Sequence, residues 1–210
     1  MIRILLVDDH AVVRRGLKQI LSEAIRGSSF QEAGSAEEAL TRVRASSFDV
    51  VILDISLPGE NGLDALKEIK QIQPNLPVLI LSVYPEEEFA VRTLRAGAAG
   101  YVTKQSASTE LVDAVRKVIG GGLYVTSALA ERLAEDVQKG AAQVPHERLS
   151  NREYQVFRLL GHGKSVTQAA DELSLSVQTV STYRSRILQK MGMSSNADLV
   201  EYVFCNRPSQ

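Results

Sequence analysis

The sequence predicts an α/β domain with a parallel five-stranded sheet, followed by a smaller all-α domain of four helices. Two observations indicate the first domain: short apolar runs alternate with helical patterns, and several of these runs end in charged side chains. A third observation indicates the second domain, because short, capped helical patterns follow one another after residue 148. We therefore expect domains at residues 1–122 and 148–210, joined by a helix and linker at 123–147.

The expected strands are short, mostly β-branched runs of the kind that a parallel sheet buries on both faces. They lie at residues 4–7, 30–34, 50–53, 78–81 and 100–103. Between them, apolar side chains recur at the spacing of amphipathic helices, around residues 13–24, 35–43, 63–69, 85–97 and 111–122. Ser35 and Glu38 predict a capping box, and Gly97 is expected to end the fourth helix.

Charged side chains follow three of these strands. Asp8 and Asp9 come after the first, Asp54 after the third and Lys104 after the fifth. Because ligands bind at the carboxyl ends of parallel strands, we expect the four residues to converge. Carboxylates held close together repel, and Mg²⁺ removes that conflict while leaving positions for phosphate oxygens. Asp54 is then the natural nucleophile for forming an aspartyl phosphate, and Lys104 adds a positive charge for the phosphate.

A simpler interpretation is that each Asp only begins a turn or caps a helix. For a single aspartate after a strand, the structural and the chemical interpretation are about equally favoured, because Asp is generally common at such positions. The combination of three aspartates with Lys104 favours the chemical interpretation.

Composition sets further bounds. No apolar stretch approaches the ~18 residues of a membrane span, and the N-terminal residues enter a strand directly, which predicts neither a membrane segment nor a signal peptide. Cys205 is the single cysteine, so no disulfide forms within the chain and a reducing cytoplasm fits. His10, His146 and His162 have no metal-ligand spacing and are expected on the surface or in turns.

The formal charge is unevenly distributed along the chain. Basic and acidic residues number 14 and 16 in residues 1–122, 2 and 4 in 123–147, and 8 and 5 in 148–210. The net charges are therefore −2, −2 and +3, which sum to −1. A basic C-terminal third suggests an anionic partner, although +3 alone is weak evidence.

The C-terminal domain is expected to contain a helix-turn-helix. A helix at Ser127–Gln138 and a linker at 139–147 precede it. Ser150 with Glu153, and Ser165 with Gln168, predict capping boxes for its first two helices. Ser176 is expected to cap a third helix after a short turn, and Ser194 or Ser195 to begin a fourth.

The third of these helices has two different faces. Val180, Ile187, Leu188 and Met191 follow core spacing, whereas a polar stripe runs opposite, and residues 177–192 contain no acidic residue. Such stripes are usually solvated, but a helix placed after a helix-turn can lie in the major groove of DNA. The candidate DNA contacts are Gln178, Ser181, Thr182, Arg184, Ser185, Arg186 and Lys190.

The first domain resembles the receiver domain of two-component response regulators over residues 1 to about 120, through Asp8, Asp9, Asp54, Ser82, Tyr101 and Lys104. The resemblance implies a flavodoxin-like strand order of 2-1-3-4-5, and phosphorylation of Asp54 by a sensor histidine kinase or a small phosphodonor. It implies that Asp9, Asp54 and the backbone carbonyl of Ser56 hold Mg²⁺, with Asp8 acting through water. Lys104 would pair with phosphoryl oxygens, while Ser82 and Tyr101 occupy the switch positions.

The second domain resembles the LuxR-type DNA-binding domain over residues 148–204. The stretches that carry this resemblance are Leu149-Ser150-Asn151-Arg152-Glu153 and Thr179-Val180-Ser181-Thr182-Tyr183-Arg184-Ser185-Arg186-Ile187. Together the two halves resemble the NarL/FixJ subfamily, although Ser181 and Tyr183 stand where many members carry Lys and His. The resemblance implies a homodimer on DNA, formed through the last helix with Leu199 and Val203.

We therefore interpret the chain as a bacterial transcription factor that is not an enzyme, controlled by phosphorylation-dependent dimerisation on promoter DNA. One alternative is a phosphatase or phosphotransferase with an aspartyl nucleophile. Such enzymes need a further acid/base carboxylate, often two positions after the nucleophile, where this chain has Ser56. Another alternative is a receiver whose C-terminal helices bind protein or RNA.

Overall fold

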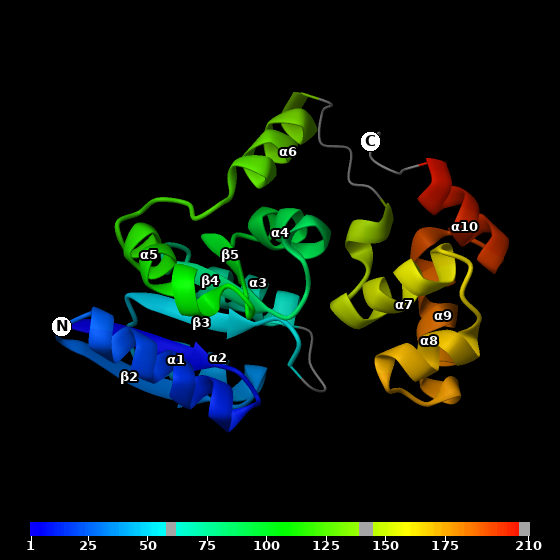
Figure 1. The fold of residues 1–210 in the computed structure, drawn as a ribbon. Coiled ribbons are helices and arrows are strands. Elements are labelled where there is room, and N and C mark those ends of the chain that lie inside the picture. The colour runs from blue at the N-terminus through cyan, green and yellow to red at the C-terminus, as the bar shows by residue number, and fades with distance from the viewer. Residues whose placement is uncertain (58–61, 139–144, 206–210) are drawn as a thin grey trace. The chain divides into compact units, whose positions relative to one another are not determined.

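The computed structural model describes residues 1–57, 62–138 and 145–205. The chain divides into two compact units, Met1–Ala141 and Ala142–Gln210 (Figure 1). The first unit contains the sheet, and the second contains helices only. This arrangement confirms the predicted fold class of each half.

One parallel sheet of five strands forms the centre of the first unit, in the order β2-β1-β3-β4-β5. The order confirms the flavodoxin-like topology. The strands are β1 (Ile2–Val7), β2 (Ser28–Ala33), β3 (Val50–Asp54), β4 (Val78–Ser82) and β5 (Gly100–Thr103). Every residue of β3 and β4 is buried, as the apolar runs in the sequence predict.

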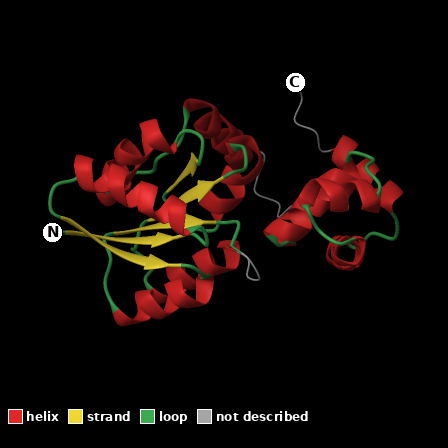
Figure 2. Cartoon of the chain, turned by 60° about the horizontal axis from the view of Figure 1, so that its bottom comes forward, coloured by secondary structure: helices red, strands yellow, loops and turns green. Residues whose placement is uncertain are grey.

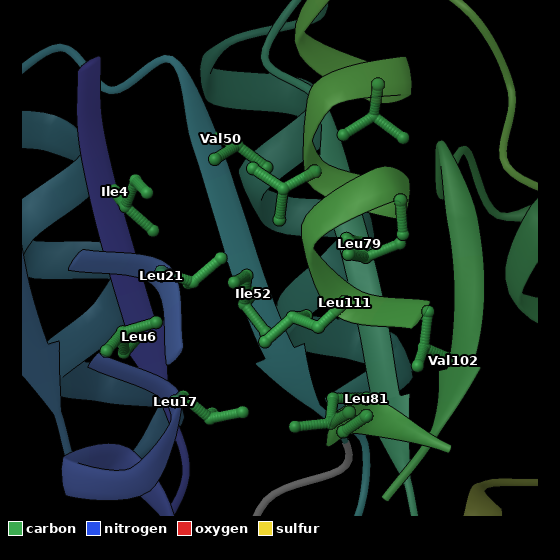
Figure 3. Close-up of a cluster of buried hydrophobic side chains, with 14 of the residues drawn as sticks. Ile4, Leu6, Leu17, Leu21, Val50, Ile52, Leu79, Leu81, Val102 and Leu111 are labelled. Atoms are coloured by element: carbon green, nitrogen blue, oxygen red, sulfur yellow. The ribbon is translucent and has the colours of Figure 1, made fainter. Parts of the chain in front are cut away.

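Helices cover both faces of this sheet (Figure 2). They are α1 (Ala11–Ala24), α2 (Ala36–Ala45), α3 (Gly62–Ile72), α4 (Glu86–Arg95) and α5 (Ala107–Ile119). The chain reverses direction across the sheet after β2, so right-handed crossovers place α1 on one face and α2, α3 and α4 on the other. Leu21 of α1 and Leu111 of α5 belong to the same buried cluster as Ile52 and Leu79 of the sheet (Figure 3).

The ends of two helices show how the sequence signals operate. Ser35 caps α2 by accepting from the N–H of Glu38 at 3.2 Å. The expected capping box is incomplete, because the Glu38 carboxylate accepts from the N–H of Gly34 at 2.7 Å instead of from Ser35. Gly97 follows α4 with a φ of +100°, a conformation that side chains rarely adopt, which explains why the helix ends there.

The helix α6 (Ser127–Gln138) packs with the first unit. Its Leu129 is 2% exposed, and Tyr124, just before it, forms an isolated parallel bridge with Gly100 of β5. Residues 139–144 of the expected linker lie outside the described residues. Residues Pro145–Arg148, at the end of the expected linker, form a 3-10 helix, η1.

The second unit packs four α-helices around one apolar core. They are α7 (Asn151–Gly161), α8 (Val166–Leu173), α9 (Val177–Met191) and α10 (Asn196–Cys205). Both predicted capping boxes are present, at Ser150 and Ser165. Ser174 turns the chain between α8 and α9 in the left-handed region, with a φ of 53°. None of the described helices is long and apolar enough to cross a membrane.

The helix η1 is anchored to this core by an aromatic cluster. His146 stacks on Phe157 with 6.2 Å between ring centroids, and its Nδ1 lies 2.9 Å from the hydroxyl oxygen of Tyr202. The expectation that His146 is a simple surface or turn residue is therefore wrong. Its place beside α7 and α10 depends on tertiary packing, which the linker-like composition around it does not reveal.

Candidate functional site

The carboxyl ends of β1, β3 and β5 bring three charged side chains into direct contact. Val7 lies beside Leu53 in the sheet, so the residues that follow them, Asp8 and Asp54, reach the same edge. The Nζ atom of Lys104 lies 2.6 Å from Oδ2 of Asp8 and 2.7 Å from Oδ2 of Asp54. Both carboxylates are 1% exposed, so these ion pairs are held away from solvent.

The pKa values in this site reflect competition between burial and hydrogen bonding. Burial raises the pKa of the Asp54 carboxyl group, and the hydrogen bonds from Lys104 and the N–H of Ser56 oppose that rise without cancelling it. Burial alone would lower the pKa of Lys104, but its bonds to Asp54 and Asp8 outweigh burial and raise it. Lys104 is therefore charged at neutral pH, and one ammonium group serves two buried carboxylates.

Asp9 and His10 extend the acidic cluster toward solvent. Nδ1 of His10 lies 2.8 Å from Oδ1 of Asp9 and 3.2 Å from Oδ1 of Asp8, and the Asp9 side chain is 28% exposed. The backbone N–H of His10 also donates to Asp8 at 2.8 Å. His10 is exposed, as expected, and its ring shares one small region with both carboxylates, an arrangement that could hold a metal ion. Its position directly after the acidic pair was the available signal.

The donor atoms of this cluster fit a hard divalent cation. Asp8, Asp9 and Asp54 supply carboxylate oxygens, the ligands that Mg²⁺ prefers. Lys104 brings one positive charge to the two buried carboxylates of Asp8 and Asp54, so a divalent cation would balance the remaining negative charge. Asp9, at the exposed side of the cluster, gives a cation access to the site.

The two expected switch residues, Ser82 and Tyr101, both hold the loop that enters α4. Ser82 is fully buried, and its Oγ accepts from the N–H of Tyr84 at 3.1 Å. The hydroxyl of Tyr101, 2% exposed, donates to the carbonyl of Tyr84 at 2.9 Å. Burial raises the pKa of Tyr101, so its hydroxyl stays protonated and remains a donor. The Tyr84 ring packs against Phe89 of α4, with 4.7 Å between centroids.

Ser56 contacts the candidate phosphoacceptor through its backbone N–H, which donates to Oδ1 of Asp54 at 2.7 Å. Its Oγ is buried and has no hydrogen-bond partner among the described residues. The expected metal ligand is the Ser56 carbonyl, and that role stays a prediction.

We expect Asp54→Asn to raise the melting temperature when divalent cations are absent. Burial makes the ionised carboxylate unfavourable, and the amide removes the charge while keeping an acceptor for Lys104. Each kcal/mol gained in the free energy of unfolding should raise the melting temperature by roughly 2–4 °C. Calorimetry in EDTA measures this, with Asp113→Asn, on a side chain that is 76% exposed, as the control. A lower melting temperature for Asp54→Asn would contradict the view that burying the ionised Asp54 carboxylate is unfavourable.

The outer face of α9 presents polar side chains, most of them neutral. Gln178, Thr182, Ser185 and Arg186 are exposed, and Ser181 is half-buried. The hydroxyl groups of Thr182 and Ser185 donate to the carbonyls of Gln178 and Ser181, at 3.0 and 3.1 Å. Because their protons are used within the helix, their oxygen atoms face outward as acceptors.

Two of the three cations expected to contact DNA phosphates are bound within the second unit. Nε of Arg184 donates to Oδ1 of Asn196 at 2.6 Å, and Nζ of Lys190 pairs with Oε2 of Glu153 at 2.7 Å. Arg184 lies four residues after buried Val180, which turns it toward α10. The prediction treated all three cations alike, but the ammonium group of Lys190 neutralises a carboxylate that is 4% exposed. A contact between Lys190 and DNA stays a prediction.

The expected dimer contacts on α10 also need correction. Leu199 is fully buried in the core of the second unit, so it is not available as a surface contact. Val203 packs close to Gly161 of α7, where an added β-carbon would collide with it. The exposed large hydrophobic side chains of α10 are Val200 and Phe204, at 39% and 71%. Apolar spacing alone did not distinguish the inner from the outer face of this helix.

We expect Lys190→Met to destabilise the second unit by about 1–2 kcal/mol, less than for a fully buried pair, because Lys190 is 42% exposed. Burial alone would raise the pKa of Glu153, but its bonds with Lys190 and Ser150 lower it below the ordinary 4.5. The contribution of the pair is therefore present above pH 4.5 and is lost as the pH falls through the lowered pKa.

Amide hydrogen exchange of α7 and α9 in the full chain, at about pH 6 and about pH 3, measures this effect. The difference between wild type and Lys190→Met should shrink at the lower pH. The exposed Arg186→Met on the same helix is the control. Equal protection of wild type and Lys190→Met at the higher pH would contradict the assigned role.

Comparison with known proteins identifies both halves of the chain. Residues 4–116 match the family model described as the response regulator receiver domain. Residues 147–203 match the model described as bacterial regulatory proteins, luxR family. The chain is 38% identical over 200 residues to the response regulator GacA of Pseudomonas viridiflava, covering 95% of this chain and 94% of that protein. It is 34% identical over 211 residues to the response regulator UvrY of Escherichia coli O6:H1, covering 98% and 97%.

Solved structures give the same result. The two-component response regulator RcsB in complex with DNA is 26% identical, with a TM-score of 0.58 over 98% of this chain and 99% of that chain. RcsB of Salmonella enterica serovar Typhimurium, bound to promoter rprA with the phosphomimetic BeF3⁻, is also 26% identical, with a TM-score of 0.57 over 97% and 99%. The chain thus belongs to the two-component response regulators in which a receiver domain is joined to a LuxR-type DNA-binding domain.

Proposed function

We propose that Asp54 accepts a phosphoryl group from a sensor histidine kinase, or from a small acyl phosphate, and that this controls binding of the chain to promoter DNA. The observation that carries the proposal is the buried Asp54 carboxylate, which Lys104 joins to Asp8. An oxygen of Asp54 attacks the phosphorus atom, a P–O bond forms, and the bond to the donor nitrogen or oxygen breaks. The donor leaves with the electron pair of that bond.

Asp9, Asp54 and the backbone carbonyl of Ser56 would hold Mg²⁺, with Asp8 acting through water. The bound cation supplies charge neutralisation as the phosphoryl group approaches the carboxylates. Asp8 and Lys104 stay fixed by their ion pair, which keeps the ammonium group beside the position that the phosphoryl oxygens would take.

The phosphoryl group would change the hydrogen bonding of the loop before α4. Lys104 donates to Asp54, and Ser82 directly follows Leu81, which lies beside Asp54 in the sheet. If Ser82 turns toward a phosphoryl oxygen, Tyr84 loses the acceptor of its N–H, while its carbonyl keeps the bond from Tyr101. The start of α4 would then shift, and this surface is the candidate output of the first unit.

The helix α9 is proposed to lie in the major groove of DNA. It follows the α8 turn, carries no acidic residue and exposes hydroxyl and amide groups along one face. Gln178, Ser181, Thr182 and Ser185 are the candidates for base contacts, and Arg186 for a phosphate contact. A protein that binds promoter DNA in this way would act in the bacterial cytoplasm.

The functional form is proposed to be a homodimer promoted by phosphorylation. One helix-turn-helix offers a small interface with DNA, whereas two related by a two-fold axis read paired half-sites. The exposed face of α10, with Val200 and Phe204, and the receiver surface near Tyr101 are the candidate contacts. The Tyr101 side chain itself is buried. Val83, which is 56% exposed, is the candidate contact residue on that receiver surface.

A gel-shift assay with genomic DNA fragments, in the presence of competing RNA, tests this function against the alternatives. A DNA complex that resists RNA supports a transcription factor. Preferential binding of RNA, or no binding of nucleic acid, would favour a receiver with a different output. Steady release of phosphate from added phosphoesters would favour the enzyme, but the position two residues after Asp54 is Ser56 and not a carboxylate.

We expect Arg186→Ala to weaken DNA binding roughly equally for all sequences. A phosphate contact releases counterions, so its loss should lower the slope of log affinity against log salt by about one. Thr182→Val should instead change site preference by roughly 1–3 kcal/mol, because the outward acceptor oxygen is lost. Fluorescence anisotropy over a salt series measures both. An unchanged slope in Arg186→Ala would remove this residue from the phosphate contacts.

A further inference from the structure

We propose that Arg14 is a positioning residue for the acidic pair, and that it fixes the backbone between β1 and α1 so that Asp8 and Asp9 can bind a divalent cation. The inference rests on the proposed Mg²⁺-dependent phosphorylation of Asp54. It concerns a side chain on the second turn of α1 that lies outside the expected set of ligands.

Arg14 contacts the acidic pair through the main chain. Its Nη1 donates to the carbonyl oxygen of Asp8 at 2.6 Å, and this carbonyl belongs to the peptide group that joins Asp8 to Asp9. On the other side of the same residue, the N–H of Asp8 donates to the carbonyl of Ala33 at 3.2 Å. The backbone of Asp8 is therefore held from both sides, which sets the direction in which each carboxylate leaves the chain.

The guanidinium group is itself held in place by β2. Its Nε donates to Oε2 of Glu32 at 3.1 Å, and the Arg14 side chain is only 17% exposed. Glu32 lies beside Leu6 in the sheet, so β2 carries its carboxylate to the end of β1. A planar guanidinium bonds to Glu32 and to the Asp8 carbonyl at once, whereas a single ammonium group is poorly suited to both directions.

Charge and position predict opposite effects of removing Arg14. If the residue acted only as a nearby cation, its loss would make the site more negative and tighten the binding of Mg²⁺. If it fixes the Asp8 backbone, its loss lets the peptide group between the two aspartates rotate, and binding weakens. Residues that orient metal ligands typically change metal affinity by about 10- to 100-fold when they are replaced.

The test is a titration of the full chain with MgCl₂, followed by the amide NMR signals of Asp9 and Ser56. We expect Arg14→Met to weaken Mg²⁺ binding by about tenfold or more, and Arg14→Lys to recover only part of it. Glu32→Gln should weaken binding less, because it leaves Arg14 charged but holds it less firmly. Arg15→Met, which removes an exposed arginine from the same helix, is the matched control and should bind like wild type.

The outcomes separate this inference from the proposed function. Tighter or equal Mg²⁺ binding in Arg14→Met, with wild type still binding Mg²⁺, would overturn the positioning role alone. A wild type that binds no Mg²⁺ would overturn the proposed function as well. Glu32→Gln serves as a second variant in case Arg14→Met fails to fold. It keeps Arg14, which donates to the Asp8 carbonyl, and leaves the core of α1 in place. If Glu32→Gln binds Mg²⁺ like wild type, the role of Glu32 in holding Arg14 is wrong.

Discussion

Asp54→Ala should abolish phosphoryl labelling when the protein is incubated with Mg²⁺ and radiolabelled acetyl phosphate. Wild type should become labelled at one site, because Asp54 is the carboxylate that contacts both Lys104 and the N–H of Ser56. Acetate leaves as the new bond to the Asp54 oxygen forms. The effect is expected to be all or none, because Asp54 is the described carboxylate that contacts Lys104 and also accepts from the N–H of Ser56, which Asp8 does not.

Two further variants show whether the acidic pair supports this reaction. Asp9→Ala should also fail to label, because losing a ligand weakens the site that screens the incoming charge. Asp113→Ala should label like wild type, since that side chain is 76% exposed on α5 and pairs with Arg116, not with a residue of the site. Labelling that persists in Asp54→Ala would overturn the assignment of the phosphoacceptor.

Phosphorylation should convert the chain into a two-fold dimer on DNA that carries paired half-sites. Moving a two-state equilibrium from 1:99 to 99:1 requires about 5.5 kcal/mol of preference for the active state. Under the proposed function, charge-assisted hydrogen bonds from Lys104 and Ser82 to the phosphoryl group would supply part of that difference. Sedimentation velocity with and without the phosphomimetic BeF3⁻ measures the change, on DNA with half-sites one helical turn, about 34–36 Å, apart.

The exposed face of α10 provides the matched variants for this experiment. Phe204→Glu should keep the fold, because the side chain is 71% exposed, but should lose pairing on DNA. Glu201→Gln, exposed on the same helix, should pair like wild type. A wild-type protein that stays monomeric in both states, even on DNA with two half-sites, would rule out the dimer.

The order of elements and the acidic site were largely predictable from the sequence. The apolar runs ending at Asp8, Asp54 and Lys104 specify strands whose carboxyl ends must meet in a parallel sheet, so their contact follows from topology. Serine caps likewise predicted the starts of α7 and α8, because capping depends on residues only three positions apart.

Contacts between distant elements were the part that the sequence did not reveal. Arg14 meets Glu32 only because β2 runs beside β1, and nothing in the local pattern of either residue indicates the pair. Lys190 looked like a phosphate contact because its helix carries no acidic residue, yet Glu153, 37 positions earlier, supplies its partner. Leu199 looked like a surface contact because a helix with apolar residues on more than one face does not identify its inner side.

The affinity of the full chain for DNA with two half-sites tests the central claim most directly, measured before and after treatment with Mg²⁺ and acetyl phosphate. We predict that the treatment tightens DNA binding by wild type by roughly 5- to 150-fold, the ordinary range of coupling between two sites. Asp54→Ala should remain at the untreated affinity. An equal gain in Asp54→Ala, or no gain in wild type that has been labelled, would contradict control of DNA binding through Asp54.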